Sequence, residues 1–341
     1  MMNKQEPITK APKKRSKIIT VLAWLIVVCL VPACCAWIIG RRVYWFDLIA
    51  SQQMLISWIA LIFMVLVLMS RRWIAGVVCL ALVCVSFSPV LVSREWTLAR
   101  VNLREKPDGA IRIVSCNMNP ENESWEKDLS LLLSLDADVV VLIEVHPELS
   151  RSIRNRQHLD SSPYARWAHR AWVKEETTPC FILSQWPMNT IGTTQDPEFA
   201  QDLLYTRIYH PNGEFVVGLA HPYSPRTQQH WTRGNQVVQA HGDAIAQLQS
   251  NLLIPIILCT DLNAGPAQQR AKTLRAAGLR MSKPVLYGGG SYPANSSIPE
   301  PLQIQLDDVW ATASISPIAW TMLELSGSDH KAVVVDFKLT E

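Results

Sequence analysis

The sequence predicts an α/β domain, built as two packed β-sheets with helices on the outside, preceded by three transmembrane helices. Two observations lead to this prediction. Hydrophobic residues make up 49% of the 341 residues, and they are concentrated in the first 93. From about residue 110 the sequence changes to short apolar runs separated by polar loops, with helical segments between some of them. Strands interleaved with helices in this way are typical of an α/β sandwich.

Three uncharged apolar stretches form the first part of the chain. Residues 18–39 and 74–92 are long enough to cross a hydrocarbon core of about 30 Å, and residues 54–69 reach that length if the helix starts near Leu48. Arginine pairs at 41–42 and 71–72 mark the breaks between the stretches. No amphipathic partner helices surround them, which favours membrane spans over the buried core helices of a soluble protein.

The distribution of basic residues predicts the orientation of the chain. Six Lys and Arg precede the first stretch and two follow it, which favours a cytoplasmic N-terminus. Three crossings then make the remainder the extracytoplasmic part of an integral protein of the cell (inner) membrane. A cleaved signal peptide is disfavoured, because apolar stretches continue beyond any early cleavage point. The predicted organisation is a basic tail (1–17), a three-helix anchor (18–93), a linker (94–109) and a soluble domain (110–341).

Charge and cysteine content argue against tight nucleic-acid binding, a cysteine metal site and a disulfide-stabilised fold. Residues 1–93 hold ten basic and two acidic residues, whereas the rest of the chain holds 22 basic and 27 acidic residues. A domain with net negative charge is a poor match for tight, non-specific binding of nucleic acid, but a local basic groove stays open. Five of the eight cysteines lie in the apolar stretches, and the other three (Cys116, Cys180 and Cys259) have no metal-ligand spacing. This is no disulfide framework.

Eight strands and three helices are expected in the soluble domain. The strand-like runs span residues 110–119, 136–145, 178–187, 203–210, 214–222, 252–263, 302–311 and 331–339. The helices span residues 124–135, 229–248 and 267–277, the last with a proline near its start. No internal repeat is found. Residues 287–301 are rich in Gly, Ser and Pro and predict a long loop, and such loops are often functional.

Polar residues gather at the ends of these strands. Glu144 closes an apolar run, where a charge needs a partner or a metal ion, and Asp261 and Asn263 share one face because they are two residues apart. Further strand ends hold Asn117, Asn119, His221, Asp307 and Asp308, and the last strand is preceded by Asp329 and His330. Taken singly, each has an ordinary explanation, such as a polar strand terminus or an Asx turn. Together they predict one cleft, whose oxygen ligands suit Mg²⁺ (or Mn²⁺) and whose two histidines suit phosphoryl chemistry.

Six motifs extend this interpretation over residues 111–339: "VSCNMN", "DADVVVLIEV", "GLAHPYSP", "LCTDLNAGP", "QLDDVWA" and "GSDHKAVVVDF". In this order they resemble the motif set of the endonuclease/exonuclease/phosphatase superfamily, which includes deoxyribonuclease I, apurinic endonucleases, neutral sphingomyelinases and inositol polyphosphate 5-phosphatases. The resemblance implies a four-layer α/β/β/α sandwich of the deoxyribonuclease I-like type and a Mg²⁺-dependent phosphoesterase. The three apolar stretches lie outside it.

The resemblance also implies a role for each site residue. Asn117, Glu144 and Asp329 would hold the metal ion, with Asn119 as a further contributor. His221 would assist the leaving group, while Asp261 and Asn263 would orient the nucleophile and contact the phosphate. Asp307 would orient His330, the general base or phosphate ligand. Asp308 stands where the family commonly has His or Tyr, so the choice between Asp307 and Asp308 as the partner of His330 stays open.

The substrate is less defined than the reaction. A nuclease that cleaves phosphodiester bonds of nucleic acid and a lipid phosphodiesterase that acts on phospholipid headgroups both fit the motifs. The nuclease is the first prediction, because nucleases form the largest branch of the family that the chain resembles. The membrane anchor and the acidic domain support the lipid phosphodiesterase as the alternative, and the lipid bilayer is a partner in either case. A third alternative is a catalytically silent, membrane-tethered binding protein. No protein partner is indicated, and a transporter is disfavoured because no ionisable residue lies inside the three stretches.

Overall fold

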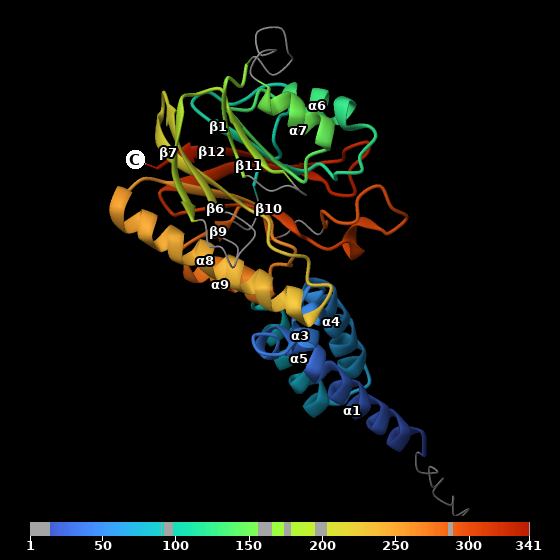
Figure 1. Cartoon of the computed structure of the whole chain (residues 1–341). Helices are drawn as coiled ribbons and strands as arrows, with labels where there is room; N and C mark the ends of the chain where they lie inside the picture. The colour runs from blue at the N-terminus through green and yellow to red at the C-terminus, as the bar shows by residue number, and fades with distance from the viewer. Residues whose placement is uncertain are drawn as a thin grey trace, which may run out of the picture.

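The computed structural model describes residues 14–89, 91, 98–155, 166–173, 179–194, 203–285 and 289–340 of the chain. It consists of a helical bundle at the N-terminal end and an α/β domain (Figure 1). Most of the predicted basic tail (1–13), part of the predicted linker (94–97) and residues 287–288 of the predicted loop lie outside the described residues. The division into tail, anchor, linker and domain stays a prediction.

The bundle contains α1 (Lys14–Cys34), α2 (Ala36–Ile39), α3 (Tyr44–Ala50), α4 (Gln53–Met69) and α5 (Trp73–Phe87). Within the described residues, one helix, Lys17–Ile39, is long and apolar enough to cross a membrane. A signal sequence near an N-terminus has the same properties. The prediction of three spans is not supported for the other two stretches. The second is bent by 72° between α3 and α4, and α5 has only 15 residues, a length of about 22 Å.

Two six-stranded sheets form the α/β domain. Sheet A contains β1 (Ile111–Asn117), β2 (Val139–Ile143), β3 (His169–Trp172), β4 (Phe181–Ser184), β11 (Ile315–Leu323) and β12 (Ala332–Leu339), in the order β11-β12-β1-β2-β4-β3. Sheet B contains β5 (Met188–Thr194), β6 (Leu203–His210), β7 (Gly213–Ala220), β8 (Ile256–Asp261), β9 (Arg280–Met281) and β10 (Asp307–Ala311), in the order β5-β6-β7-β8-β10-β9.

Both sheets are built around one parallel pair with antiparallel neighbours. β1 pairs in parallel with β2 and antiparallel with β12, while β8 pairs in parallel with β7 and antiparallel with β10. The carboxyl ends of β1 and β2 therefore lie beside the amino end of β12. In the same way, the carboxyl ends of β7 and β8 lie beside the amino end of β10, where Asp307 is the direct cross-strand partner of Asp261.

Helices cover the outer face of each sheet (Figure 1). α6 (Trp125–Leu133) and α7 (Pro147–Arg154) pack on sheet A, and α8 (Gln228–Leu252) and α9 (Gln269–Ala276) pack on sheet B. Successive side chains of β1 point to opposite faces of sheet A, and both faces are buried. Ile113 belongs to the core between the sheets, whereas Val114 packs in the core beneath the helices. The result is the predicted four-layer α/β/β/α sandwich.

The eight predicted strands (β1, β2, β4, β6, β7, β8, β10 and β12) and the three predicted helices (α6, α8 and α9) are all present. The sequence does not predict the short helix α7 or the strands β3, β5, β9 and β11. These four strands are the sheet edges. An edge strand has a partner on one side only and needs no long apolar run, and β11 also contains Pro317 next to a register shift, so none of the four has a clear strand pattern.

Candidate active site

Six polar residues meet at one end of the sandwich, three from each sheet. Sheet A supplies Asn117 at the end of β1, Glu144 directly after β2 and His330 just before β12. Sheet B supplies Asp261 at the end of β8, His221 directly after β7 and Asp307 at the start of β10. All six were predicted from strand ends, and the topology of the two sheets explains why residues so far apart in the sequence lie together.

Three contacts between the sheets join these residues in pairs. Asn117 Nδ2 donates to Asp261 Oδ2 at 2.9 Å, and His221 Nε2 lies 3.3 Å from Glu144 Oε1. His330 Nδ1 and Asp307 Oδ2 form a hydrogen bond of 2.8 Å. The pairs are also connected to each other, because Asn117 Nδ2 donates to Glu144 Oε2 at 3.1 Å and His330 Nδ1 lies 3.9 Å from Asp261 Oδ2. The site is therefore one continuous polar network.

Glu144 is held in an unusual backbone conformation. Its φ of 52° lies in the left-handed region, which residues other than Gly, Asn and Asp rarely adopt. Strain of this kind concentrates at functional sites. Burial alone would raise the pKa of Glu144, but contacts with His221 and Asn117 outweigh burial and lower this pKa to about 2. Glu144 is thus a carboxylate at neutral pH, and 27% of its side-chain surface is exposed.

His330 is fixed from three sides. Its backbone amide donates to Ser328 Oγ at 3.0 Å, and Ser328 Oγ in turn donates to the carbonyl of Asn117 at 2.7 Å. The ring of Tyr292 lies against the imidazole, with 4.9 Å between the ring centroids. Burial alone would lower the pKa of His330, but the negative charges of Asp307 and Asp261 raise it to about 10. The imidazole is therefore a hydrogen-bond donor at neutral pH in these surroundings.

His221 also lies near Asp261, with 3.8 Å between its Nε2 and Asp261 Oδ2. Burial alone would lower the pKa of His221, but the Cys180 thiol and the Glu144 carboxylate outweigh burial and raise this pKa well above 6.5. The loop after His221 is tied to the "LCTDLNAGP" motif, since Asn263 Nδ2 donates to the carbonyl of Pro222 at 3.1 Å. The backbone amide of Asn263 donates to Asp261 Oδ1 at 3.0 Å. Asn263 therefore connects the loops that carry His221 and Asp261.

The side chains of three predicted residues form no hydrogen bond with this network among the described residues. Asn119 reaches it through the backbone only, since its amide donates to Asn117 Oδ1 at 3.0 Å. Asp308 faces the opposite side of β10, where its carboxylate accepts from Trp320 Nε1 and from the amides of Val309 and Lys283. The side chain of Asn119 accepts from the amide of Glu121, which makes it a turn residue. Asp329 contributes its charge to the raised pKa of His330, and its backbone carbonyl accepts from Ala294. Asp307, not Asp308, is the partner of His330.

The donor set fits a hard divalent cation. Glu144, Asp261 and Asp307 place three carboxylates in one network, and like charges this close favour a bound positive charge. Ligand atoms of Asp261, Asp307 and His330 lie within 4.8 Å of one another. Asn117 is oriented with its amide donors toward two carboxylates, so it organises the ligands. Oxygen ligands of this kind suit Mg²⁺ or Mn²⁺ better than zinc.

Several supporting residues are not predicted from the sequence. Ser291 Oγ accepts from the amide of Asp307 at 3.0 Å, and Ser328, Tyr292 and Cys180 contact the two histidines. Ser291 and Tyr292 belong to the long loop that the composition of residues 287–301 indicates. The composition gives no signal for which loop residues reach the site, because this depends on where the loop folds back against β10 and β12.

The sequence places the chain in a family that matches this fold and site. Residues 122–330 match the sequence profile of the Endonuclease/Exonuclease/phosphatase family. The chain therefore belongs to this family and is a phosphoesterase of that superfamily. No curated protein matches the sequence of the chain.

Solved structures share the fold at low sequence identity. The catalytic domain of human Nocturnin with bound sulfate anion is 16% identical, with 69% of this chain and 97% of that chain covered and a TM-score of 0.51. The endonuclease/exonuclease/phosphatase from Beutenbergia cavernae DSM 12333 is 17% identical, with 67% and 72% covered and a TM-score of 0.53. D. rerio TDP2 complexed with single strand DNA product is 15% identical, with 68% and 100% covered and a TM-score of 0.50. These likenesses confirm the deoxyribonuclease I-like fold.

Proposed function

We propose that the chain is a Mg²⁺-dependent phosphoesterase that hydrolyses phosphodiester bonds at the polar network between the two sheets. The observation that supports this best is the set of three cross-sheet pairs, Asn117–Asp261, Glu144–His221 and Asp307–His330. They combine carboxylates for a cation with two histidines for proton transfer. Metal-assisted hydrolysis of a phosphodiester uses both of these components.

In this proposal Glu144, Asp329 and Asn117 belong to the metal site, with Asp261 and Asp307 close by. When bound, the cation would offset negative charge on the phosphate oxygens and lower the pKa of the neighbouring imidazole of His330. Glu144 is the best placed of these residues, because its carboxylate is ionised and partly exposed. Asn119 and Asp308 have no part in this proposal, since their side chains bind elsewhere.

The two histidines have separate roles in the proposed reaction. His330, oriented by Asp307, takes a proton from water as the general base once its imidazole is neutral, and in its protonated form it donates a hydrogen bond to the phosphate. His221 is buried and protonated, so it can stabilise the leaving oxygen. Asp261 and Asn263 orient the attacking water and contact the phosphate from the loop after β8.

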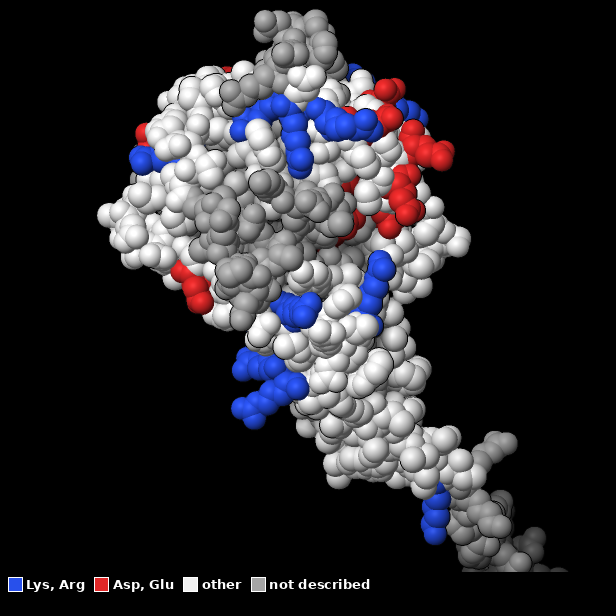
Figure 2. Space-filling model, in the orientation of Figure 1, with Lys and Arg blue, Asp and Glu red and all other residues white. Residues whose placement is uncertain are grey.

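We propose that the helical bundle is a membrane anchor. Its exterior is apolar: Val28, Ile62 and Val77 each expose about 60% of their surface. Its interior holds polar side chains, since Gln53 Nε2 donates to Ser86 Oγ at 2.6 Å and Ser57 pairs with Ser86 at 2.8 Å. An apolar exterior with hydrogen-bonded polar side chains in the interior is expected in lipid. The face drawn in Figure 2 shows acidic and basic side chains on the surface of the α/β domain but no acidic side chain on the surface of the bundle.

The proposed orientation has a cytoplasmic N-terminus and an extracytoplasmic domain. Reporters fused to the C-terminus test it: alkaline phosphatase, which is active outside the cytoplasm, should give signal, and a cytoplasm-dependent fluorescent reporter should not. The opposite result would contradict this orientation.

A substrate panel on the full chain in detergent tests the reaction. Plasmid DNA, single-stranded DNA, sphingomyelin-type lipids and a generic phosphodiester would each be assayed with Mg²⁺ and with a chelator. One structural neighbour was solved with single-strand DNA product, which makes DNA the first substrate to compare. We expect hydrolysis that requires the metal ion and that is lost in His330→Ala and in Glu144→Ala. No hydrolysis of any substrate would favour the catalytically silent binding protein.

A phospholipid headgroup phosphodiesterase is the second candidate, and one contact favours it. The hydroxyl of Tyr44, in α3 of the bundle, donates to the carbonyl of Pro225 at 2.8 Å. Pro225 lies four residues after His221, so the proposed anchor touches the loop of a catalytic residue. A site held this close to the bilayer suits a substrate that is part of it. Preference for lipid over DNA in the panel would select this candidate.

A further inference from the structure

The helical bundle contacts the domain at the loops of the active site. Besides its bond to Pro225, Tyr44 meets the ring of Trp231 edge-on, with 6.1 Å between the centroids. On the neighbouring helix α2, Trp37 stacks against Lys272 of α9, with 4.8 Å from Nζ to the ring centroid. Residues 36–50 thus lie against the first turns of α8 and α9, and these turns directly follow the loops 221–227 and 261–268.

Asp47 is at the centre of this contact. It is the only acidic residue of the described bundle and is 1% exposed. Its carboxylate accepts from Trp231 Nε1 at 2.8 Å, from the backbone amide of Gln269 at 2.9 Å and from Gln268 Nε2 at 3.5 Å. Gln269 is the first residue of α9, so the carboxylate also stabilises the positive end of that helix. A buried charge needs such partners, and all of them come from the domain.

Arg270, the next residue of α9, links this contact to the active site. Its guanidinium donates to the carbonyl of Leu262 at 2.9 Å and to the carbonyl of Tyr223 at 2.8 Å, which fixes both active-site loops. Burial lowers the pKa of Arg270 to about 10, while the charges of Asp47 and Asp261 oppose this effect. The buried cation therefore lies between a carboxylate of the bundle and a carboxylate of the catalytic network. Gly234 of α8 makes room for it, since a Cβ there would collide with the guanidinium.

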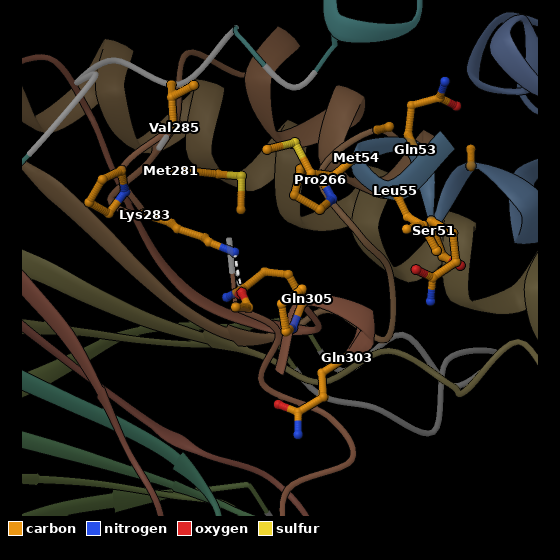
Figure 3. A pocket seen from close by; sticks show the side chains of 16 residues that line it. Ser51, Gln53, Met54, Leu55, Pro266, Met281, Lys283, Val285, Gln303 and Gln305 are labelled. Atoms are coloured by element: carbon orange, nitrogen blue, oxygen red, sulfur yellow. Dashed lines mark hydrogen bonds between the residues drawn. The ribbon is translucent and has the colours of Figure 1, made fainter. Parts of the chain in front are cut away.

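A second contact between bundle and domain lies at the start of α4. Figure 3 shows a pocket where Met54 and Leu55 of α4 face Met281, Lys283 and Gln305 of the domain. Lys283 Nζ donates to Gln305 Oε1 at 2.9 Å, and Gln305 Nε2 donates to the carbonyl of Asp307. The bundle thus lies beside three of the segments that carry the catalytic network.

We infer that the bundle is a structural part of the active site and that Asp47 is a positioning residue for catalysis. Through Trp231, the first turn of α9 and Arg270, Asp47 holds the loops that carry His221, Asp261 and Asn263. The anchor would then do more than keep the enzyme at a membrane, because the geometry of the reaction depends on its docking. The catalytic part of this inference rests on the proposed phosphoesterase function, whereas the docking part does not.

The test uses the full chain in detergent and measures two quantities. Asp47→Ala should accelerate amide hydrogen exchange in residues 221–227 and 261–269 and leave β1 and β12 unchanged. It should also lower kcat about tenfold or more with little change in KM, since misplaced catalytic groups cost rate rather than substrate binding. Asp47→Asn keeps one acceptor oxygen and should fall between Ala and the wild type. Asp243→Ala is the matched control, because Asp243 is exposed on α8 and, within the described part of the chain, its carboxylate accepts from Gln239 alone.

Trp231→Phe is the second variant, in case Asp47→Ala does not fold. It keeps the ring and removes only the donor to Asp47, and it should show the same local exchange with a smaller loss of kcat. Either of two results would overturn the inference. One is amide hydrogen exchange in the two loops of Trp231→Phe that equals the wild type. The other is exchange in Asp47→Ala that is no faster than in Asp243→Ala. If the wild type hydrolyses no phosphoester, the proposed function fails, and the exchange measurement alone decides whether the bundle positions the loops.

Discussion

Nδ1 of His330 and Oδ2 of Asp307 lie 2.8 Å apart and join the first strand position of β10 in one sheet to the residues before β12 in the other. Both side chains are almost fully buried. The bond orients the imidazole and, with Asp261, raises its pKa to about 10. The first prediction concerns this pair.

Replacing Asp307 with Asn should lower kcat by about a hundredfold or more, because oriented acid–base groups contribute factors of this size. The same change should move the pH–rate profile of the full chain to lower pH, since a negative charge that raises the pKa of His330 is lost. Asp308→Asn is the matched control: it is adjacent and buried but faces Trp320. Equal losses in the two variants would show that orientation of His330 is not what Asp307 provides.

The second prediction concerns the metal ion. Treatment with a chelator should abolish hydrolysis, and Mg²⁺ should restore it. In Glu144→Gln the Mg²⁺ concentration for half-maximal activity should rise about tenfold to a hundredfold, the usual effect of losing an interaction at a metal site. Glu148→Gln, an exposed residue on α7, should behave like the wild type. A Glu144 variant with normal Mg²⁺ dependence would remove this residue from the metal site.

The third prediction concerns stability away from the site. Arg112 on β1 and Asp336 on β12 are fully buried and joined by bonds of 2.7 and 2.9 Å. Arg112→Met leaves the carboxylate without a charged partner and should lower the free energy of unfolding by about 3–5 kcal/mol. Arg112→Met combined with Asp336→Leu should cost less than the single change, measured by denaturant unfolding in detergent. A double variant that is less stable than Arg112→Met alone would contradict this prediction.

The fourth prediction is a pH dependence of stability at the opposite end of β2. Burial alone would raise the pKa of Asp138, but His210, Lys106, the amide of Arg112 and Trp186 lower it to about 2. A carboxyl whose pKa is lower in the folded state stabilises the fold above its unfolded pKa near 3.8, and this stability is lost as the pH falls toward 2.

The free energy of unfolding of the wild type should therefore fall by about 2 kcal/mol between pH 4 and pH 2 from this group alone. Asp138→Asn should be less stable at pH 7, and the difference from the wild type should shrink over that interval. Asp136→Asn is the control, because Asp136 is exposed and two residues away. A difference that stays constant from pH 7 to pH 2 would rule out this linkage.

The sequence predicts the interior of the fold better than its borders. Central strands such as β2 and β8 are apolar over their whole length because both faces are buried, so they are visible as continuous runs. The edge strands β3, β5, β9 and β11 have no such requirement and are not predicted. The long apolar stretches mark the bundle correctly, but hydropathy cannot locate the bend between α3 and α4.

The six residues of the network could be proposed because Asp, Glu, Asn and His recur at several strand ends, although each of them taken singly has an ordinary explanation. Which neighbour faces the site could not be predicted. Asp307 and Asp308 are adjacent, and alternation sends them to opposite sides, so the choice depends on the register of β10 with β8. Asp47 could not be anticipated either, since its partners are more than 180 residues away in the sequence.

The matching strand order of the two sheets has a consequence for the residues of the network. When the order of sheet B is reversed, β8 corresponds to β1, β7 to β2 and β10 to β12, with the same parallel and antiparallel pairings. Under this correspondence each cross-sheet pair of the network joins two equivalent positions: Asn117 with Asp261, Glu144 with His221, and His330 with Asp307. Two carboxylates in one such pair would repel each other, whereas each pair here joins two different side chains. The two sheets therefore share a strand order while the residues at equivalent positions differ, which agrees with a sequence in which no repeat is detectable.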